Sequence, residues 1–88
     1  MGKSKADIAG PIAVRLLREK REALGLSMNA VAKRARLSHS MISRVEHELR
    51  RPTLDTLLRI AEAMEIELWP LIKESENAFR PTSKAKSR

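Results

Sequence analysis

The chain has 88 residues, with 18 Lys and Arg against 11 Asp and Glu, so its formal net charge is +7 and its pI is near 10.6. This length suits one small domain, and the absence of Cys excludes disulfides and thiolate metal sites. The basic balance favours a polyanionic partner, while one Trp, one Phe and no Tyr argue against recognition by base stacking. Duplex DNA therefore fits better than single strands.

No apolar run approaches the roughly 18 residues that a membrane-spanning helix needs. Lys3 and Lys5 near the N-terminus precede no apolar stretch, so we expect no secretory signal. These features predict a cytoplasmic protein without a membrane partner.

The first predicted helix begins at Gly10-Pro11, because Pro suits the opening position of a helix. Residues 1–8 before it are mostly polar and are expected to form a flexible segment. The helix ends at Gly25, a residue typical of a left-handed cap. Its predicted apolar stripe consists of Ile12, Ala13, Leu16, Leu17 and Leu24.

Residues 27–52 are predicted to form two short helices joined by a tight turn. Ser27 and Ser38 can each cap a helix by accepting a backbone N–H. Apolar residues recur at helical spacing after both caps, so each helix has one buried face. These residues are Met28, Val31, Ala32 and Ala35 in the first helix and Met41, Ile42 and Val45 in the second.

Polar side chains occupy the other face of the second helix, and they are His39, Ser40, Ser43 and Arg44. They suit hydrogen bonding to base edges, and Arg can bind a guanine edge with two hydrogen bonds. At the start of the preceding helix, the backbone N–H groups of Ser27 and Met28 and the side chain of Asn29 can hold a phosphate. Ser38, Arg50 and Arg51 can add further contacts to the DNA backbone.

Thr53 can cap a strongly amphipathic helix that continues to Met64 and is expected to form the main wall of the core. A short last helix is predicted from Trp69 to Glu76. The domain thus covers residues 9–76, and the basic residues 77–88 are expected to be a disordered tail. The predicted apolar positions of the longer helix are Leu54, Leu57, Leu58, Ile60, Ala61 and Met64.

Catalytic chemistry finds little support in the sequence. His39 and His47 are eight residues apart, so they are not neighbouring ligands on one helix, and no acidic cluster has metal-ligand spacing. Ser40 beside His39 lacks an orienting acid, and adjacent helical side chains diverge. We therefore expect no enzyme activity, no metal and no cofactor.

Residues 27–52 resemble the helix-turn-helix of the lambda-repressor-like domains, also called the Cro/cI-type or XRE family. The family's small residue falls on Ala32, its closing Glu on Glu46 and its Arg-Arg-Pro on 50–52. The similarity extends to about Ile72. The sequence departs from the family where it has Met28 instead of Gln, and where Arg36, Glu48 and Glu65 replace Gly.

The resemblance implies an all-α compact bundle of about five short helices that binds duplex DNA through residues 39–46 in the major groove. It also implies that Arg21 pairs with Glu46. Related domains often dimerise near the last helix, so Trp69, Leu71 and Ile72 are candidates for a homodimer contact, with a place in the core as the alternative for Trp69. A bacterial or phage transcriptional regulator is expected, which blocks or recruits polymerase, and a repressor is the main expectation.

Two other functions fit the same motif. Similar small domains form the DNA-binding antitoxin half of toxin–antitoxin pairs, whose partner is a toxin protein. Others are controller proteins of restriction–modification systems, which can activate as well as repress. The sequence leaves both alternatives open.

Overall fold

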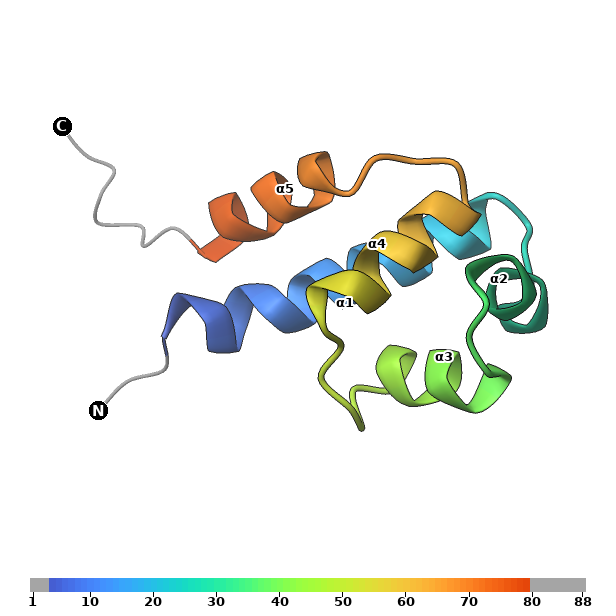
Figure 1. The fold of residues 1–88 in the computed structure, drawn as a ribbon. Helices are drawn as coiled ribbons and strands as arrows, with labels where there is room; N and C mark the ends of the chain where they lie inside the picture. Colours follow the sequence, from blue (N-terminus) through green and yellow to red (C-terminus); the bar gives the residue numbers. More distant parts are fainter. Residues whose placement is uncertain (1–3, 80–88) are drawn as a thin grey trace, which may run out of the picture.

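A computed structural model describes residues 4–79, which form five helices and no strand. The helices are the expected number, and the fold class is all-α (Figure 1). The predicted second and third helices are present with nearly the expected boundaries. The elements are α1 (Lys5–Ala23), α2 (Met28–Ala35), α3 (His39–Glu46), α4 (Leu54–Ala63) and α5 (Trp69–Phe79).

Hydroxyl caps begin α2, α3 and α4, as the sequence predicts. Ser27 Oγ accepts the Ala30 N–H at 3.0 Å and Ser38 Oγ accepts the Met41 N–H at 3.0 Å. Thr53 Oγ1 caps α4 in the same way. Each hydroxyl satisfies a donor that has no acceptor within its own helix, and this fixes where the helix begins.

The prediction for the start of α1 is wrong, because the helix begins at Lys5 and not at Gly10-Pro11. Ser4 and Asp7 form a capping box, in which each side chain bonds the other residue's backbone N–H. This cap outweighs the single helical hydrogen bond that Pro11 cannot donate inside α1. Residues 4–8 therefore belong to the fold, and the predicted flexibility of residues 1–3 lies outside the described residues.

The C-terminal end also differs from the prediction, because α5 continues to Phe79 and not only to Glu76. The expected disorder of the remaining tail, residues 80–88, lies outside the described residues.

Left-handed residues end the first four helices. Gly25 has a φ of 72°, whereas the non-glycine residues Arg36, Glu48 and Glu65 have φ values of 61°, 59° and 59°. After each of these residues the next N–H reaches back to the helix, as Leu37 N–H does to the Ala32 carbonyl at 2.9 Å. This pattern closes the helix end and redirects the chain.

Replacing Arg36 by Gly is expected to raise the free energy of unfolding by about 1 kcal/mol, because glycine adopts positive φ without a Cβ clash. Urea denaturation measures the change. Lys33→Gly is the matched control, since it replaces a neighbouring exposed basic residue by glycine within the regular part of α2. The control should lose about 1 kcal/mol. A loss of stability in Arg36→Gly as well would refute backbone strain at Arg36.

The long helix α1 lies between α5 on one side and α3 on the other, while α2 packs against α3 and α4 (Figure 1). Ala32 and Ala35 are 3% and 4% exposed, and their small side chains allow close packing of α2. The core joins residues of all five helices and holds α2 and α3 in place. Its members are Leu17, Val31, Ala32, Ala35, Ile42, Ile60, Ala61, Ala63, Met64, Leu68 and Leu71.

The apolar face of α4 differs from the predicted one. Ile60, Ala61 and Met64 are buried as expected, but Leu54 and Leu58 are 64% and 49% exposed. Thr56 takes a place in the interior instead, at 8% exposure. The buried face of α4 is thus rotated away from the two leucines, because α2 and the core pack on the side of Ile60 and Met64.

Candidate nucleic-acid interface

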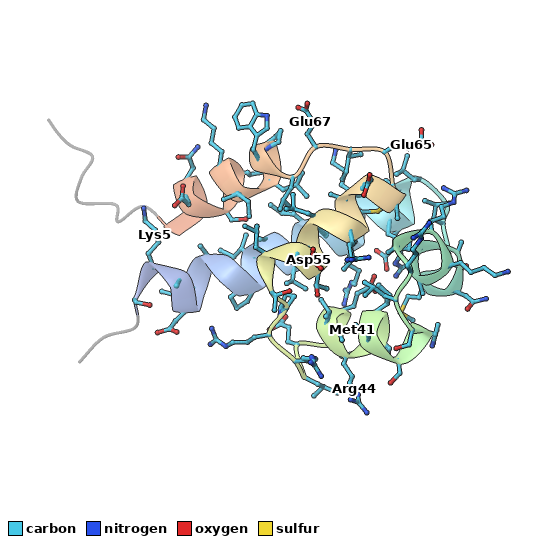
Figure 2. The ribbon with its side chains drawn as sticks, viewed as in Figure 1. Lys5, Met41, Arg44, Asp55, Glu65 and Glu67 are labelled. Carbon is cyan, nitrogen blue, oxygen red and sulfur yellow. The ribbon has the colours of Figure 1, made fainter. Side chains whose placement is uncertain are left out.

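Packing of α3 determines which of its side chains face outward. Ile42 and Val45 are 1% and 2% exposed, so they fix the inner face of this helix. His39, Ser40 and Arg44 are exposed on the opposite face. Figure 2 shows Arg44 pointing away from the body of the protein at the end of the molecule formed by α3.

Ser43 is less available than the sequence suggests. Its side chain is half-buried, and its Oγ lies 3.3 Å from Nδ1 of His47. The hydroxyl can still reach a ligand, but it is already engaged within α3.

His47 is an exposed residue of this surface that the sequence analysis did not select. It lies three residues after Arg44 and four after Ser43, and therefore on the same side of α3. Its Nδ1 is 2.7 Å from the Ser43 carbonyl oxygen. An Nδ1–H that donates to this carbonyl leaves Nε2 available to a partner. Helical spacing from Arg44 was the signal that could have identified it.

Arg21 and Glu46 connect α1 to the end of α3. Arg21 Nε donates to Glu46 Oε2 at 2.7 Å, and Nη2 donates to Oε1 at 2.9 Å. A third donor, Nη1, binds the Leu26 carbonyl at 2.8 Å. The two side chains are only 13% and 11% exposed. This two-point ion pair holds the last turn of α3 against α1 and the start of the α1–α2 loop.

The hydrogen bonding of Arg21 to the Glu46 carboxylate, which accepts from the guanidinium, raises the pKa of Arg21 above its ordinary value, while burial acts in the opposite direction. Arg21 is therefore charged at every pH at which the protein is used. Titration of Arg21 therefore does not affect the ion pair that holds α3 against α1.

The first turn of α2 combines an exposed Ser27 and Asn29 with a half-buried Met28. The Met28 side chain packs against the core, so only its backbone N–H can serve a ligand. N–H groups in the first turn of a helix lack partners within the helix and carry partial positive charge. This end of α2 therefore suits a phosphate, with Asn29 as the flexible donor.

Arg50 and Arg51 lie in the loop between α3 and α4, and both are exposed. Arg51 Nη2 lies 3.6 Å from Asp7 Oδ1 in a surface ion pair, with the Arg51 side chain 78% exposed. Such a pair contributes little energy, so Arg51 can exchange it for a phosphate. Ser38 is also exposed, although its Oγ already caps α3.

Charge is unevenly distributed along the chain. Residues 27–52 contain six Lys and Arg but only two acidic residues, Glu46 and Glu48. Glu46 is neutralised by Arg21, so the α2–α3 unit and its following loop present a basic surface. Its basic residues are Lys33, Arg44, Arg50 and Arg51. Arg34 and Arg36 instead line a hollow against α4, where Arg34 Nη1 donates to the Ala63 carbonyl at 3.4 Å.

The three residues expected at a dimer contact do not form one exposed patch. Trp69 is 61% exposed, and its Nε1 donates to Glu67 Oε1 at 3.2 Å. Ile72 is half-buried against the core, and Leu71 is 5% exposed within it. The prediction for Leu71 is therefore wrong, because the packing of α5 on α1 turns this residue inward.

Among residues 4–79 there is no group of three or more His, Cys, Asp or Glu side chains placed to hold a metal ion. Within the same residues, no helix has the length and apolar character required to cross a membrane.

The HTH_3 family model, described as helix-turn-helix, matches residues 17–68. The restriction–modification controller protein C.AhdI from Aeromonas hydrophila has a similar structure, with 35% identity and a TM-score of 0.65. The match covers 75% of this chain and 97% of the controller.

An HTH_3 family transcriptional regulator from Vibrio cholerae is 25% identical, with a TM-score of 0.70 over 85% of this chain. The match covers 42% of the length of the Vibrio protein. None of the curated proteins compared with the chain matches it.

Proposed function

Because this chain belongs to the HTH_3 helix-turn-helix family of DNA-binding transcriptional regulators, we propose that it is a homodimeric repressor that reads duplex DNA in the major groove with α3. The observation that carries this proposal is the outward face of α3, which is polar and basic. The ion pair between Arg21 and Glu46 fixes this helix against α1. Such a regulator acts on cytoplasmic DNA without a cofactor, and bound protein blocks access of polymerase to the promoter.

In this proposal the side chains divide into base-reading and backbone-binding groups. Arg44 is the principal base contact, because its guanidinium can bind O6 and N7 of one guanine together. Phosphate contacts fix the position of α3 along the groove. His39, Ser40 and Ser43 complete the base-reading group, and Ser27, Met28, Asn29, Ser38, Arg50 and Arg51 form the backbone-binding group.

The short length of α3 supports a homodimer. Its eight residues span about two turns, so one copy reaches only a few base pairs. Two copies related by two-fold symmetry read half-sites about one DNA turn apart, which multiplies specificity.

Arg51→Ala is expected to weaken binding about fivefold, and by a similar factor for specific and random duplexes, because it removes one phosphate contact. The slope of log affinity against log salt concentration should flatten by about 1. Fluorescence anisotropy at several salt concentrations measures both quantities. Lys73→Ala, on α5, removes the same charge from another surface and should leave the slope unchanged. Equal slopes for both variants would contradict the phosphate contact.

Selection of bound duplexes from a random DNA library at about 150 mM salt tests the proposed function, since nonspecific binding is weak at this ionic strength. The expected product is an inverted repeat whose half-sites lie about one helical turn apart. Transcription in vitro from a promoter that contains this site should then decrease as protein is added. Binding without any enriched sequence would contradict specific readout.

Similarity to C.AhdI favours a second candidate, a controller of restriction–modification genes, because the match covers nearly all of that protein. A controller of this kind can activate transcription as well as repress it. Transcription that rises at low protein concentration and falls at high concentration would favour the controller over a simple repressor.

A further inference from the structure

Six large apolar side chains are at least one third exposed in the described part of the chain: Ile8, Leu24, Leu49, Leu54, Leu58 and Trp69. Only Leu54 and Leu58 among them lie one turn apart on one helix, where they share a face. Together they form a small apolar patch on the surface of α4, which a partner can cover.

The charges beside the two leucines are of opposite sign. Arg59 Nε donates to Asp55 Oδ2 at 2.8 Å, and the side chains of Arg59 and Asp55 are 44% and 75% exposed. A two-fold contact brings a surface against its own copy, so it requires a surface that is complementary to itself. Arg34, Arg36, Glu62 and Glu65 line the same hollow as Leu58, Asp55 and Arg59, so charges of both signs surround Leu58. A face of mixed charge meets this requirement when two α4 helices cross antiparallel.

The orientation of α4 fits a DNA-bound dimer. Figure 2 shows Arg44 at the lower edge of the molecule, Glu67 at the upper edge, and Asp55 between them on the near side. The partner in a two-fold complex lies beside the DNA-reading surface, because both copies of α3 must reach the same side of one duplex. Trp69 is hydrogen-bonded to Glu67, which lies at the edge opposite Arg44. The start of α5 is therefore less suitably placed than α4 for a contact between two DNA-bound copies.

We infer that a second copy of this chain docks on the α4 face formed by Leu54, Asp55, Leu58 and Arg59. The leucines of the two copies pack together, and each Asp55 faces the partner's Arg59. This inference rests on the proposed homodimer and replaces the α5 contact with a specific surface. The dimer then positions two copies of α3 in successive major grooves.

Sedimentation equilibrium of the full chain tests the surface. Leu58→Glu is expected to raise the dimer dissociation constant at least about tenfold, since two apolar contacts are lost per dimer. Trp69→Ala, the matched control at another exposed apolar residue, should leave the constant within about twofold, because it lies outside the contact. The inference would be overturned if the parent chain stayed monomeric without DNA at tens of micromolar. It would also be overturned if Trp69→Ala raised the dimer dissociation constant more than Leu58→Glu does.

Charge reversal tests the pairing between copies. Asp55→Arg gives a face with two positive charges, whereas Arg59→Asp gives a face with two negative charges. Each variant alone should be monomeric because like charges meet, while an equimolar mixture should form a heterodimer. Both side chains are exposed, so thermal melts should show that each variant folds. Absence of association in the mixture would overturn the proposed pairing.

Library selection separates this inference from the proposed function. A parent chain that dimerises through α4 but enriches no DNA sequence would refute the function and leave the dimer surface standing. Enrichment of a single half-site by a monomeric parent would refute the dimer surface and leave DNA reading by α3 standing.

Discussion

Arg21→Ala is expected to lower the free energy of unfolding by about 3 kcal/mol, because it leaves the Glu46 carboxylate largely buried without its partner. This is the lower end of the range for buried pairs, since about a tenth of each side chain remains exposed. The Leu26 carbonyl loses its donor as well. Urea denaturation at neutral pH measures the change in midpoint at constant slope.

Glu22→Ala is the matched control for this variant. Glu22 Oε2 lies 3.8 Å from Arg21 Nη2, but its side chain is 57% exposed, so its removal should cost less than about 0.5 kcal/mol. Arg21→Ala combined with Glu46→Ala should be less destabilised than the sum of the single variants, because neither charge is then left alone. Additive losses would show that the two residues act independently.

Arg44→Ala is expected to reduce binding of the selected duplex by about 1 to 3 kcal/mol, since a bidentate contact to guanine is lost. Binding to random duplexes should fall much less. Specificity should relax at one base pair in each half-site, while the fold is unchanged because Arg44 is exposed. Anisotropy titrations on duplexes with single base-pair changes provide the measurement.

Lys33→Ala serves as the control for Arg44→Ala, because it removes one exposed positive charge from the neighbouring helix α2. It should not change which base pair is preferred at any position. Equal losses on the selected and random duplexes for Arg44→Ala would show that this arginine contributes charge and not base recognition.

Much of the fold could be predicted from local signals. Ser27, Ser38 and Thr53 each mark a helix start, because a hydroxyl cap acts within three residues of itself. The start of α1 was missed because the Ser4 and Asp7 capping box competes with the preference of Pro11 for a helix start. The capping box and Pro11 each act on neighbouring residues only. Which of them determines the start of α1 depends on how α1 packs against α5.

Side-chain exposure was harder to predict than helix position. The periodicity of α4 includes Leu54 and Leu58 with its buried residues, although other helices cover only part of this apolar face. The family resemblance suggests a dimer contact at Leu71, whereas the exposure of this residue depends on how α5 packs on α1. The exposure of these leucines depends on tertiary packing, which cannot be read from the spacing of apolar residues along one helix.

The contact between Arg21 and Glu46 joins residues 25 positions apart, so only the family resemblance could suggest it before the structure. The outward face of α3 was accessible to sequence reasoning, because Ile42 and Val45 define its opposite side. His47 was missed because it follows the last residue of α3, where helical spacing is less readily applied.

Methylation protection by dimethyl sulfate on the selected duplex tests major-groove reading by α3 most directly, because guanine N7 is exposed only in that groove. The parent protein should protect one guanine N7 in each half-site, and Arg44→Ala should lose this protection at concentrations where it still occupies the duplex. Identical protection by both proteins, or no guanine protected by the bound parent, would contradict the assignment of α3 as the reading helix.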